Sequence, residues 1–266
     1  NDLADLLAAE ALDGVNVASP NTVHFAQALA AVRAGRHVLV EKPATSTPAE
    51  FAELVAAADA AGVVVFEGMR SVYDPGTARV RQLLGELGAV RLVSLRYCQR
   101  SARYDRVLAG ERVNIFDPAL GGGALNDLGV YVVSALVDLF GEPERVSAGL
   151  VPVAGGADGA GSAVATYPGF VAQLAWSKIT ASELPSEIQG ERATLVIDNL
   201  PAPRLLTLNR LDGGSERFVV DGPAFDLGFE VRRFAELCLT GGDASPDHAR
   251  TLAVLRTMAA IRAAAG

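Results

Sequence analysis

Hydrophobic residues recur along the first 68 positions in two alternating patterns, one with helical spacing and one of short continuous runs. Leucines at positions 3, 6, 7 and 12 form one helical stripe, and Gly14 can end that helix. The next predicted elements are a strand at VNVAS (15–19), a helix from Asn21 to Ala34, a strand at 37–42, a helix from Thr47 to Ala61 and a strand at 63–68. Strictly alternating helices and strands are typical of a parallel sheet covered by helices.

Local signals mark the ends of these helices. Asn21 can cap the second helix and Gly35 can end it. Thr47, Pro48 and Glu50 resemble a capped start with proline in the first turn.

After Arg70 the pattern changes to strands joined by short turns. The predicted elements are helices at 75–87, 125–141, Phe225–Leu239 and 247–265, and strands at 91–100, 145–153, 162–168, 170–179, 187–197, 204–211 and 216–220, with a flexible turn region at 154–162. Such runs of strands are typical of a mostly antiparallel sheet. The predicted fold class is α/β: a parallel sheet covered by helices in residues 1–69, then an α+β domain (70–266) with a largely antiparallel sheet.

The composition of the 266-residue chain is globular, with half of the residues hydrophobic and a fifth charged. A net charge of -8 and a pI near 5.0 argue against nucleic-acid binding, which needs clustered positive charge. No uninterrupted apolar run approaches the about 20 residues that span a bilayer, so we expect no membrane partner.

The cysteines and histidines are few and scattered. Cys98 and Cys238 make neither a metal-binding spacing nor a disulfide framework, so a reducing cytoplasm is the simplest setting. His24, His37 and His248 form no local cluster, and we expect no metal.

The stretch VLVEKP, residues 38–43, ends a predicted strand with an acid, a lysine and a proline. Proline restricts the preceding residue to extended conformations, so Lys42 is held at the strand end. Ligands of open α/β sheets bind outside the carboxyl ends of the strands, which makes Lys42 a candidate site residue. The alternative is a solvated charge pair leaving the sheet.

Asp127 and Tyr131 are four residues apart in the predicted helix after the triple glycine 121–123, so they lie on one helix face. An acid and a phenol one turn apart are candidates for acid–base chemistry. The alternative is a first-turn carboxylate favoured by the helix dipole and an amphipathic tyrosine at the rim.

Three stretches together resemble the Gfo/Idh/MocA family of nicotinamide-dependent oxidoreductases: ASPNTVHFAQALAAVRAGRHVLVEKP (18–43), GGGALNDLGVY (121–131) and FEVRRFAELCLTGG (229–242). The resemblance implies that residues 1–69 are part of a Rossmann dinucleotide-binding domain and that residues 70–266 form a substrate domain with a large open sheet, whose last helix can pack back on the first domain. It also implies NADP or NAD as cofactor and hydride transfer to or from a sugar, polyol or cyclic diol. It places the family's EKP motif on Glu41, Lys42 and Pro43, and its acid–base pair on Asp127 and Tyr131. The tyrosine form resembles the branch of glucose-fructose oxidoreductase and the dihydrodiol dehydrogenases.

The chemistry of these side chains agrees with the implied roles. A free tyrosine has a pKa of about 10, which is too high for it to take the proton of a substrate hydroxyl group easily. A lysine ammonium about 4 Å away contributes roughly 4 kcal/mol at an effective dielectric of 20, which favours the phenolate. Lys42, Tyr131 and Asp127 are therefore the predicted catalytic residues, with Asp127 orienting a substrate hydroxyl.

The resemblance also implies binding positions. The implied cofactor-binding residues are Pro20, Asn21, His24, Glu41, Lys42, Pro43, Glu67 and Arg70. The implied substrate-binding residues are Arg100, Arg103, Tyr104, Asn114 and Trp176. For Asn21 and His24 the alternative is that they are a helix cap and a first-turn histidine. For Arg100 and Arg103 it is that they are solvated loop side chains. For Trp176 it is packing in the core or a place in a dimer interface.

The chain begins within a predicted helix and contains no GxGxxG turn of the kind that holds a pyrophosphate. We therefore expect about the first two βα units of the cofactor domain, with the residue that selects NAD or NADP, to lie upstream. The alternative function is a non-catalytic binding protein or fragment that retains the substrate domain.

The strands between residues 145 and 220 outnumber the helices available to cover them. A single layer of sheet has two faces to cover. FVAQLAWSKI (170–179) places Val171, Gln173, Ala175 and Ser177 on one side and Ala172, Leu174, Trp176 and Lys178 on the other, and even the more polar side is too apolar to leave widely exposed. We therefore expect a homodimer or homotetramer that pairs through the open sheet.

Overall fold

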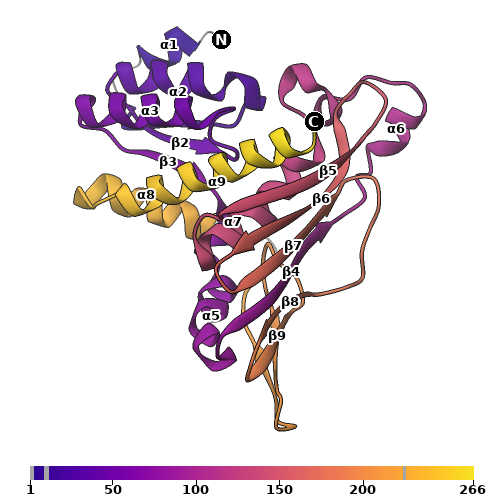
Figure 1. The fold of residues 1–266 in the computed structure, drawn as a ribbon. Helices are drawn as coiled ribbons and strands as arrows, with labels where there is room; N and C mark the ends of the chain where they lie inside the picture. Colours follow the sequence, from indigo (N-terminus) through magenta and orange to yellow (C-terminus); the bar gives the residue numbers. More distant parts are fainter. Residues whose placement is uncertain (1–2, 9–11, 224–225) are drawn as a thin grey trace.

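The computed structural model describes residues 3–8, 12–223 and 226–266. They form a small parallel sheet in the N-terminal part of the chain and a large sheet in the C-terminal part, with helices between and around them (Figure 1). The predicted fold class, a Rossmann-like parallel sheet followed by a mostly antiparallel open sheet, is confirmed.

The N-terminal sheet is parallel, and its strands lie side by side in chain order. They are β1 (Gly14–Val17), β2 (His37–Glu41) and β3 (Val65–Gly68). The helices around them are α1 (Leu3–Leu7), the 3-10 turn η1 (Asn21–Val23), α2 (His24–Arg33) and α3 (Pro48–Ala61). Val38 and Val40 of β2 belong to the same buried core cluster as Phe51 and Leu54 of α3, and none of the four is exposed. The apolar periodicity thus produces a dry layer between the sheet and its helices.

The C-terminal sheet has the spatial order β11-β10-β9-β8-β4-β7-β6-β5 and is antiparallel except where β4 pairs with β7. Its strands are β4 (Val90–Cys98), β5 (Arg145–Pro152), β6 (Asp158–Tyr167), β7 (Phe170–Ser177), β8 (Ser186–Gly190), β9 (Ala193–Ile197), β10 (Leu205–Arg210) and β11 (Ser215–Val219). The helical segments of this part are α4 (Arg70–Tyr73), α5 (Pro75–Leu83), η2 (Leu84–Leu87), α6 (Tyr104–Leu108), η3 (Asn114–Phe116), η4 (Pro118–Leu120), the π-helical turn η5 (Leu125–Gly129), α7 (Val130–Phe140), α8 (Gly228–Thr240) and α9 (Ser245–Ala264).

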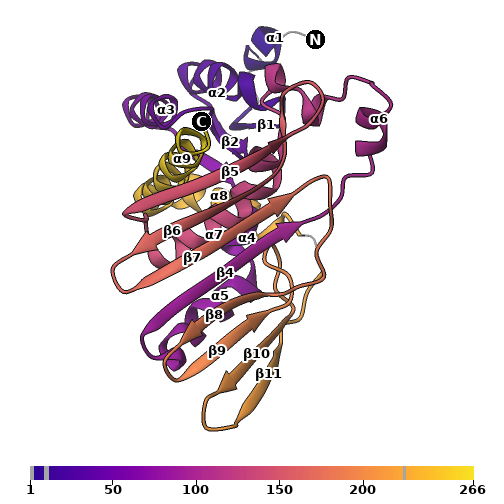
Figure 2. The ribbon, with the colours of Figure 1, turned by 45° about the vertical axis from the view of Figure 1, so that its right-hand side comes forward.

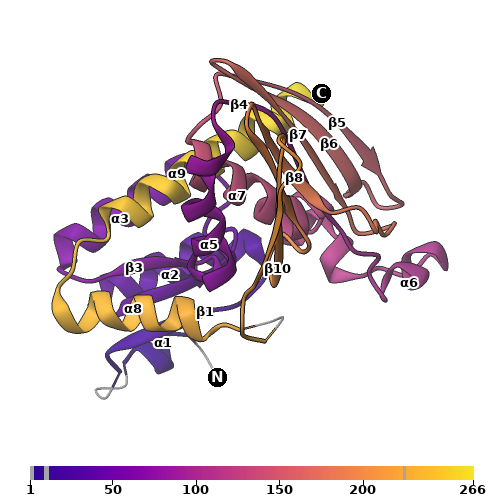
Figure 3. The same cartoon turned by 90° about the horizontal axis from the view of Figure 1, so that it is seen from below.

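Helices cover one face of the large sheet, and the opposite face has no helix over it in the part of the chain that the structure describes (Figures 2 and 3). Strand β7 shows the difference, because Ala172, Leu174 and Trp176 point to the covered face and are at most 2% exposed, whereas Val171 is 36% exposed. The alternation predicted for this strand is therefore confirmed.

Helix α9 lies between the two sheets (Figure 1). Leu255 packs into the N-terminal core, while Val254, Met258 and Ile261 pack into the core of the large sheet. The last helix therefore joins both parts.

Several local expectations need correction. Gly14 begins β1 rather than ending a helix, and the predicted strand at 187–197 is split into β8 and β9 by a turn. The region 154–162 is not only a turn, because β6 begins at Asp158. Phe225, the predicted start of α8, lies outside the described residues.

The capping signals were correct at α3 and wrong before α2. Thr47 Oγ1 accepts a hydrogen bond from the Glu50 amide, and the Glu50 carboxylate accepts one from the Thr47 amide, which completes a capping box. Asn21 makes no capping bond, because its side chain bonds across to the C-terminal part.

Among the described residues, one helical stretch, Pro118–Phe140, is long and apolar enough to cross a membrane by length and composition. Buried residues make up 61% of its most apolar window, and α7 packs between the large sheet and α9. The core helix of a folded domain has the same composition, so the stretch is weak evidence for a membrane span.

Candidate active site

A cavity of about 190 Å³ lies where the two parts of the chain meet. Ser19, Pro20 and Asn21, which follow β1, and Lys42, which follows β2, form its N-terminal wall. The cavity therefore lies at the carboxyl ends of two neighbouring parallel strands, where open α/β sheets bind their ligands. Its C-terminal wall consists of Asn114, Ile115, Leu120, Gly121, Gly122, Gly123, Asn126, Asp127 and Lys178.

Lys42 reaches from the N-terminal wall to the C-terminal one. Its Nζ donates to the backbone carbonyl oxygen of Asp127 at 3.0 Å and to Asp127 Oδ1 at 2.8 Å. An ammonium has three N–H donors, so one remains for a ligand in the cavity.

Asp127 is bound on both carboxylate oxygens. Lys42 pairs with Oδ1 and Lys178 pairs with Oδ2. Burial works against the carboxylate, but the two ammonium groups outweigh it and lower the pKa of Asp127 to about 2. Asp127 is therefore ionised at neutral pH and anchors two cations.

The backbone at Asp127 departs from the predicted α-helix, because Leu125–Gly129 is a π-helical turn. The Asp158 carboxylate accepts from the Leu125 amide at 2.7 Å and fixes the start of this turn. A Cβ on Gly129 would lie 3.1 Å from the Trp176 ring, so glycine lets the turn approach the sheet. Single π-helical turns of this kind are frequent at functional sites.

Tyr131 lies one turn beyond Asp127 and is 8% exposed. The Lys42 Nζ is 5.0 Å and the Arg70 guanidinium carbon is 5.2 Å from the centre of its ring, and Tyr97 packs edge-on at 5.7 Å. Burial opposes the charge on Lys42, but Tyr131 and Asp127 outweigh it and raise the pKa of Lys42 above its usual value. Lys42 is thus the cation that contacts both the Asp127 carboxylate and the Tyr131 ring.

The triple glycine leaves no room for a side chain at Gly121 or Gly123. A Cβ on Gly121 would lie 2.8 Å from the Asn21 side chain, and one on Gly123 would lie 2.2 Å from the Asp158 carboxylate. The Asn21 Nδ2 donates to the Gly121 carbonyl oxygen at 2.9 Å, which joins the two parts at the cavity edge.

The implied cofactor residues divide into two groups. Pro20, Asn21 and Lys42 line the cavity, whereas His24 is fully buried. The ring nitrogens of His24 lie 3.0 and 2.8 Å from the carbonyl oxygens of Pro43 and Ser19, so His24 ties the two strand-end loops together. Glu41 ends β2 and is half-buried, and Pro43 is buried.

Glu67 and Arg70 are also buried and lie outside the cavity lining. The Glu67 carboxylate accepts from the Ala44 amide at 3.0 Å and from Thr251 Oγ1 at 2.9 Å, and burial raises its pKa. It therefore holds the loop after Lys42 against α9.

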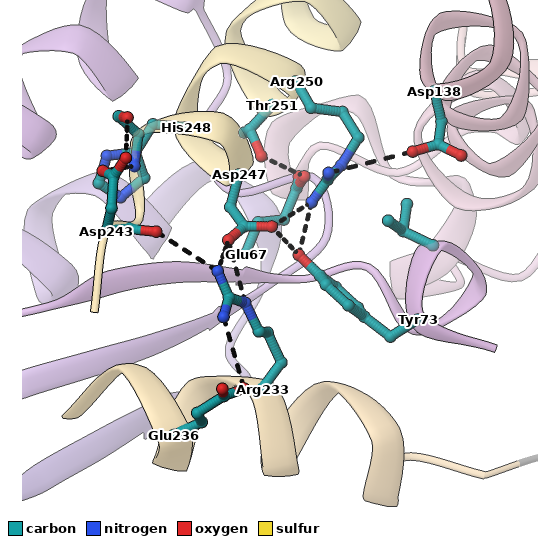
Figure 4. A network of polar contacts seen from close by, with 12 residues as sticks. Glu67, Tyr73, Asp138, Arg233, Glu236, Asp243, Asp247, His248, Arg250 and Thr251 are labelled. Atoms are coloured by element: carbon teal, nitrogen blue, oxygen red, sulfur yellow. Dashed lines mark hydrogen bonds and ion pairs between the residues drawn. The ribbon is translucent and has the colours of Figure 1, made fainter. Parts of the chain in front are cut away.

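Beside Glu67, a polar network joins α4, α8 and α9 (Figure 4). The Tyr73 hydroxyl donates to Asp247 Oδ1 at 2.7 Å, and Asp247 also pairs with Arg233 and Arg250. Burial raises the pKa of Tyr73, so its hydroxyl stays a donor. The network fixes the C-terminal helices behind the site.

Of the residues that the resemblance implies for substrate binding, one lines the cavity and the others do not. Asn114 lines the cavity. Arg100 is exposed and pairs with Asp105, Arg103 is exposed, and Tyr104 packs on Phe116; none of these three lines the cavity. Trp176 is 1% exposed in the core, as the core-packing alternative expected.

Lys178 and Asn126 line the cavity and were missed as site residues. The chain held a signal for Lys178, because only two of its 23 Lys and Arg residues are lysines, and the other is Lys42. Within the described ranges, no group of three His, Cys, Asp or Glu side chains is placed to hold a metal ion.

The cavity lies where open parallel α/β sheets bind dinucleotides and other ligands, and the lysine, carboxylate and tyrosine gathered near it are groups that can hold a substrate oxygen and transfer a proton. Residues 1–69 match the oxidoreductase family with the NAD-binding Rossmann fold, and residues 77–196 match the GFO/IDH/MocA C-terminal domain. The chain belongs to the GFO/IDH/MocA oxidoreductase family.

Characterised relatives support this assignment. The scyllo-inositol 2-dehydrogenase (NADP(+)) IolU of Bacillus subtilis (strain 168) is 38% identical over 237 residues, which cover 89% of this chain and 72% of the relative. The D-xylose 1-dehydrogenase (NADP(+)) 2 of Haloferax volcanii is 30% identical and covers 96% of this chain and 79% of its own. The crystal structure of KijD10, a 3-ketoreductase from Actinomadura kijaniata in complex with NADP and TDP-benzene, matches with a TM-score of 0.88 at 25% identity, covering 98% of this chain and 81% of that chain.

Proposed function

We propose that the protein transfers a hydride between NADP, or NAD, and the alcohol or carbonyl group of a sugar, polyol or cyclic diol. The observation that carries the proposal is the Lys42 ammonium, which is held by Asp127 at the cavity and lies beside Tyr131. The two relatives are named for scyllo-inositol and D-xylose, both rich in hydroxyl groups, and both names specify NADP(+).

The described residues fit the nicotinamide end of such a cofactor. The cavity opens at the carboxyl ends of β1 and β2, and Ser19, Asn21 and Lys42 give it polar atoms on that side. These residues would hold the nicotinamide and its ribose. When bound, the nicotinamide supplies or accepts the hydride.

The side chains of the protein carry out the proton transfer that accompanies hydride transfer. In the reducing direction, Lys42 donates its third N–H to the substrate carbonyl oxygen and stabilises the negative charge that develops there. Tyr131 supplies the proton to that oxygen, and in the oxidising direction it takes the proton from the hydroxyl. Asp127 keeps Lys42 in place throughout.

The test uses the purified protein. Oxidation of NADPH and NADH is followed with ketoses and inosones, and reduction of NADP+ with inositols, aldoses and cyclic diols. A deuterium isotope effect at the reacting carbon would identify hydride transfer. Failure to bind either dinucleotide at millimolar concentration would support a non-catalytic binding protein instead.

The open sheet supports a proposal on assembly. The uncovered face carries a cross-strand row that includes Ser147, Val164, Gln173 and Ser94, and Val164 is 44% exposed. We propose that a second copy of the chain covers this face, as a homodimer or within a homotetramer. We also propose a cytoplasmic location, because Cys98 and Cys238 are both free thiols.

A further inference from the structure

The two lysines of the chain bind the same carboxylate. The other 21 cationic side chains among the 23 Lys and Arg residues are arginines, yet Asp127 is held by Lys42 on Oδ1 and by Lys178 on Oδ2. Lysine offers a compact ammonium where arginine offers a planar fork, so the two are not interchangeable in a confined site. The use of lysine at these two positions indicates a requirement of the site.

Lys178 is fixed more firmly than an ordinary surface lysine. It is 2% exposed, its amide donates to the Gly159 carbonyl oxygen at 2.8 Å, and its own carbonyl oxygen accepts from the Ser101 amide at 2.8 Å. Its Nζ lies 5.2 Å from the centre of the Phe116 ring. A buried ammonium costs free energy unless it is paired, so the pair with Asp127 is what allows Lys178 to be there.

We propose that Lys178 is a positioning residue of the reaction centre, which holds the Asp127 carboxylate in the orientation that keeps Lys42 at the cavity. This inference rests on the proposed hydride transfer. With Oδ2 bound by Lys178, Asp127 presents Oδ1 and its backbone carbonyl to Lys42, and the two contacts fix the Lys42 ammonium. Without Lys178 the carboxylate can rotate, and Lys42 loses its fixed position.

Other ionisable groups surround the pair. Tyr131 on α7 faces Lys42, and Tyr97 on β4 packs against Tyr131. Arg262 on α9 donates to Asn126, next to Asp127 in the chain, and Asp158 on β6 binds the start of the π-helical turn. Lys42 and Lys178 are the two cations in direct contact with the Asp127 carboxylate among the described residues.

The kinetic test is a double-mutant cycle with Lys178→Met and Asp127→Asn. We expect Lys178→Met to lower kcat by at least about tenfold with a smaller change in KM, because it disturbs Lys42 more in the transition state than in substrate binding. In the Asp127→Asn background the same change should alter kcat by less than about twofold. The proposal would be overturned if the losses of kcat caused by Lys178→Met and Asp127→Asn multiplied in the double variant. It would also be overturned if Lys178→Met alone kept a kcat near that of the native protein.

A second measurement needs neither cofactor nor substrate. Carbon-13 NMR titration of the aspartate carboxyl groups should place the pKa of Asp127 near 2 in the native protein. In Lys178→Met, or in Lys178→Gln if the first variant does not fold, we expect that pKa to rise by about 1 to 3 units because one cation is lost. If the pKa of Asp127 were the same in the Lys178 variant as in the native protein, the proposed pairing of Lys178 with Asp127 would be refuted. If the native protein reduces and oxidises none of the tested substrates, the proposed function fails while this titration still tests Lys178.

Discussion

The Nζ of Lys42 lies 5.0 Å from the centre of the Tyr131 ring, and the two residues belong to opposite parts of the chain. Lys42 follows a strand of the parallel sheet, whereas Tyr131 lies on the helix that packs under the large sheet. The pair therefore forms only when the two parts are docked. Asn21, whose side chain bonds to Gly121, is one of the contacts that hold them together.

The first prediction concerns Lys42. Lys42→Ala should lower kcat by at least about 100-fold, because it removes the cation that contacts the substrate oxygen and supports the proton transfer. Steady-state rates with the best substrate measure the effect, and circular dichroism checks the fold. Arg33→Ala, on the exposed side of α2, is the matched control and should leave kcat unchanged. A Lys42→Ala rate near that of the native protein would remove Lys42 from the mechanism.

The second prediction concerns Tyr131. Tyr131→Phe keeps the ring that contacts Lys42, Arg70 and Tyr97 and removes only the hydroxyl. We expect kcat to fall by about two orders of magnitude or more, because the group that gives and takes the proton is lost. The melting temperature should change little. If Tyr131→Phe kept a kcat near that of the native protein, the proton transfer would have to be assigned to another group.

Much of the fold follows from local sequence patterns. The helical and strand periodicities predicted the alternating N-terminal elements and the sides of β7, because burial repeats with the period of each element. The Thr47–Glu50 capping box was predicted for the same reason, since its partners are three residues apart. Lys42, Asp127 and Tyr131 were singled out by their motifs, and the structure brings all three together.

Contacts between distant segments were outside the reach of such patterns. Asn21 was expected to cap its own helix, but it bonds to a carbonyl group 100 positions away. Lys178 and Trp176 are two positions apart and share one face of the predicted strand, so periodicity alone could not show that one enters the cavity while the other is buried in the core. The π-helical turn at Asp127 also has no local signature, because it depends on two distant strands. The Asp158 carboxylate of β6 accepts from the Leu125 amide, and Gly129 lies against the Trp176 ring of β7.

The third prediction concerns Glu230, which is 2% exposed and has no hydrogen-bond partner for Oε2 among the described residues. Burial, with Glu41 adding to it, raises the pKa of Glu230 from 4.5 to about 8, although Arg70 opposes the shift. The folded protein therefore keeps a proton that the unfolded chain releases above pH 4.5. The contribution of Glu230 to stability should be greatest below that pH and should be lost as the pH rises toward 8.

Glu230→Gln should remove this dependence, because glutamine resembles the protonated acid and cannot ionise. Urea unfolding at acidic and alkaline pH measures the effect. At alkaline pH the variant should be more stable than the native protein by up to a few kcal/mol, since one pKa unit corresponds to about 1.4 kcal/mol. Glu236→Gln, on the exposed side of the same helix, should show no such gain. Equal pH dependence in the native protein and Glu230→Gln would contradict the prediction.

The last prediction concerns the uncovered face of the large sheet, on which we expect a second copy of the chain. Val164 and Val171 lie on neighbouring strands of this face and are 44% and 36% exposed, with Gln173 between them on β7. Interfaces of this kind bury on the order of 2,000 Å² in total, and a charge in their centre without a partner is costly to bury. Val164→Arg should therefore convert the homodimer to a monomer at micromolar concentration, as measured by light scattering. Leu239→Arg, on α8 and 85% exposed, is the matched control and should leave the assembly unchanged. A native protein that is already monomeric at that concentration would show that this face is not an interface between copies of the chain.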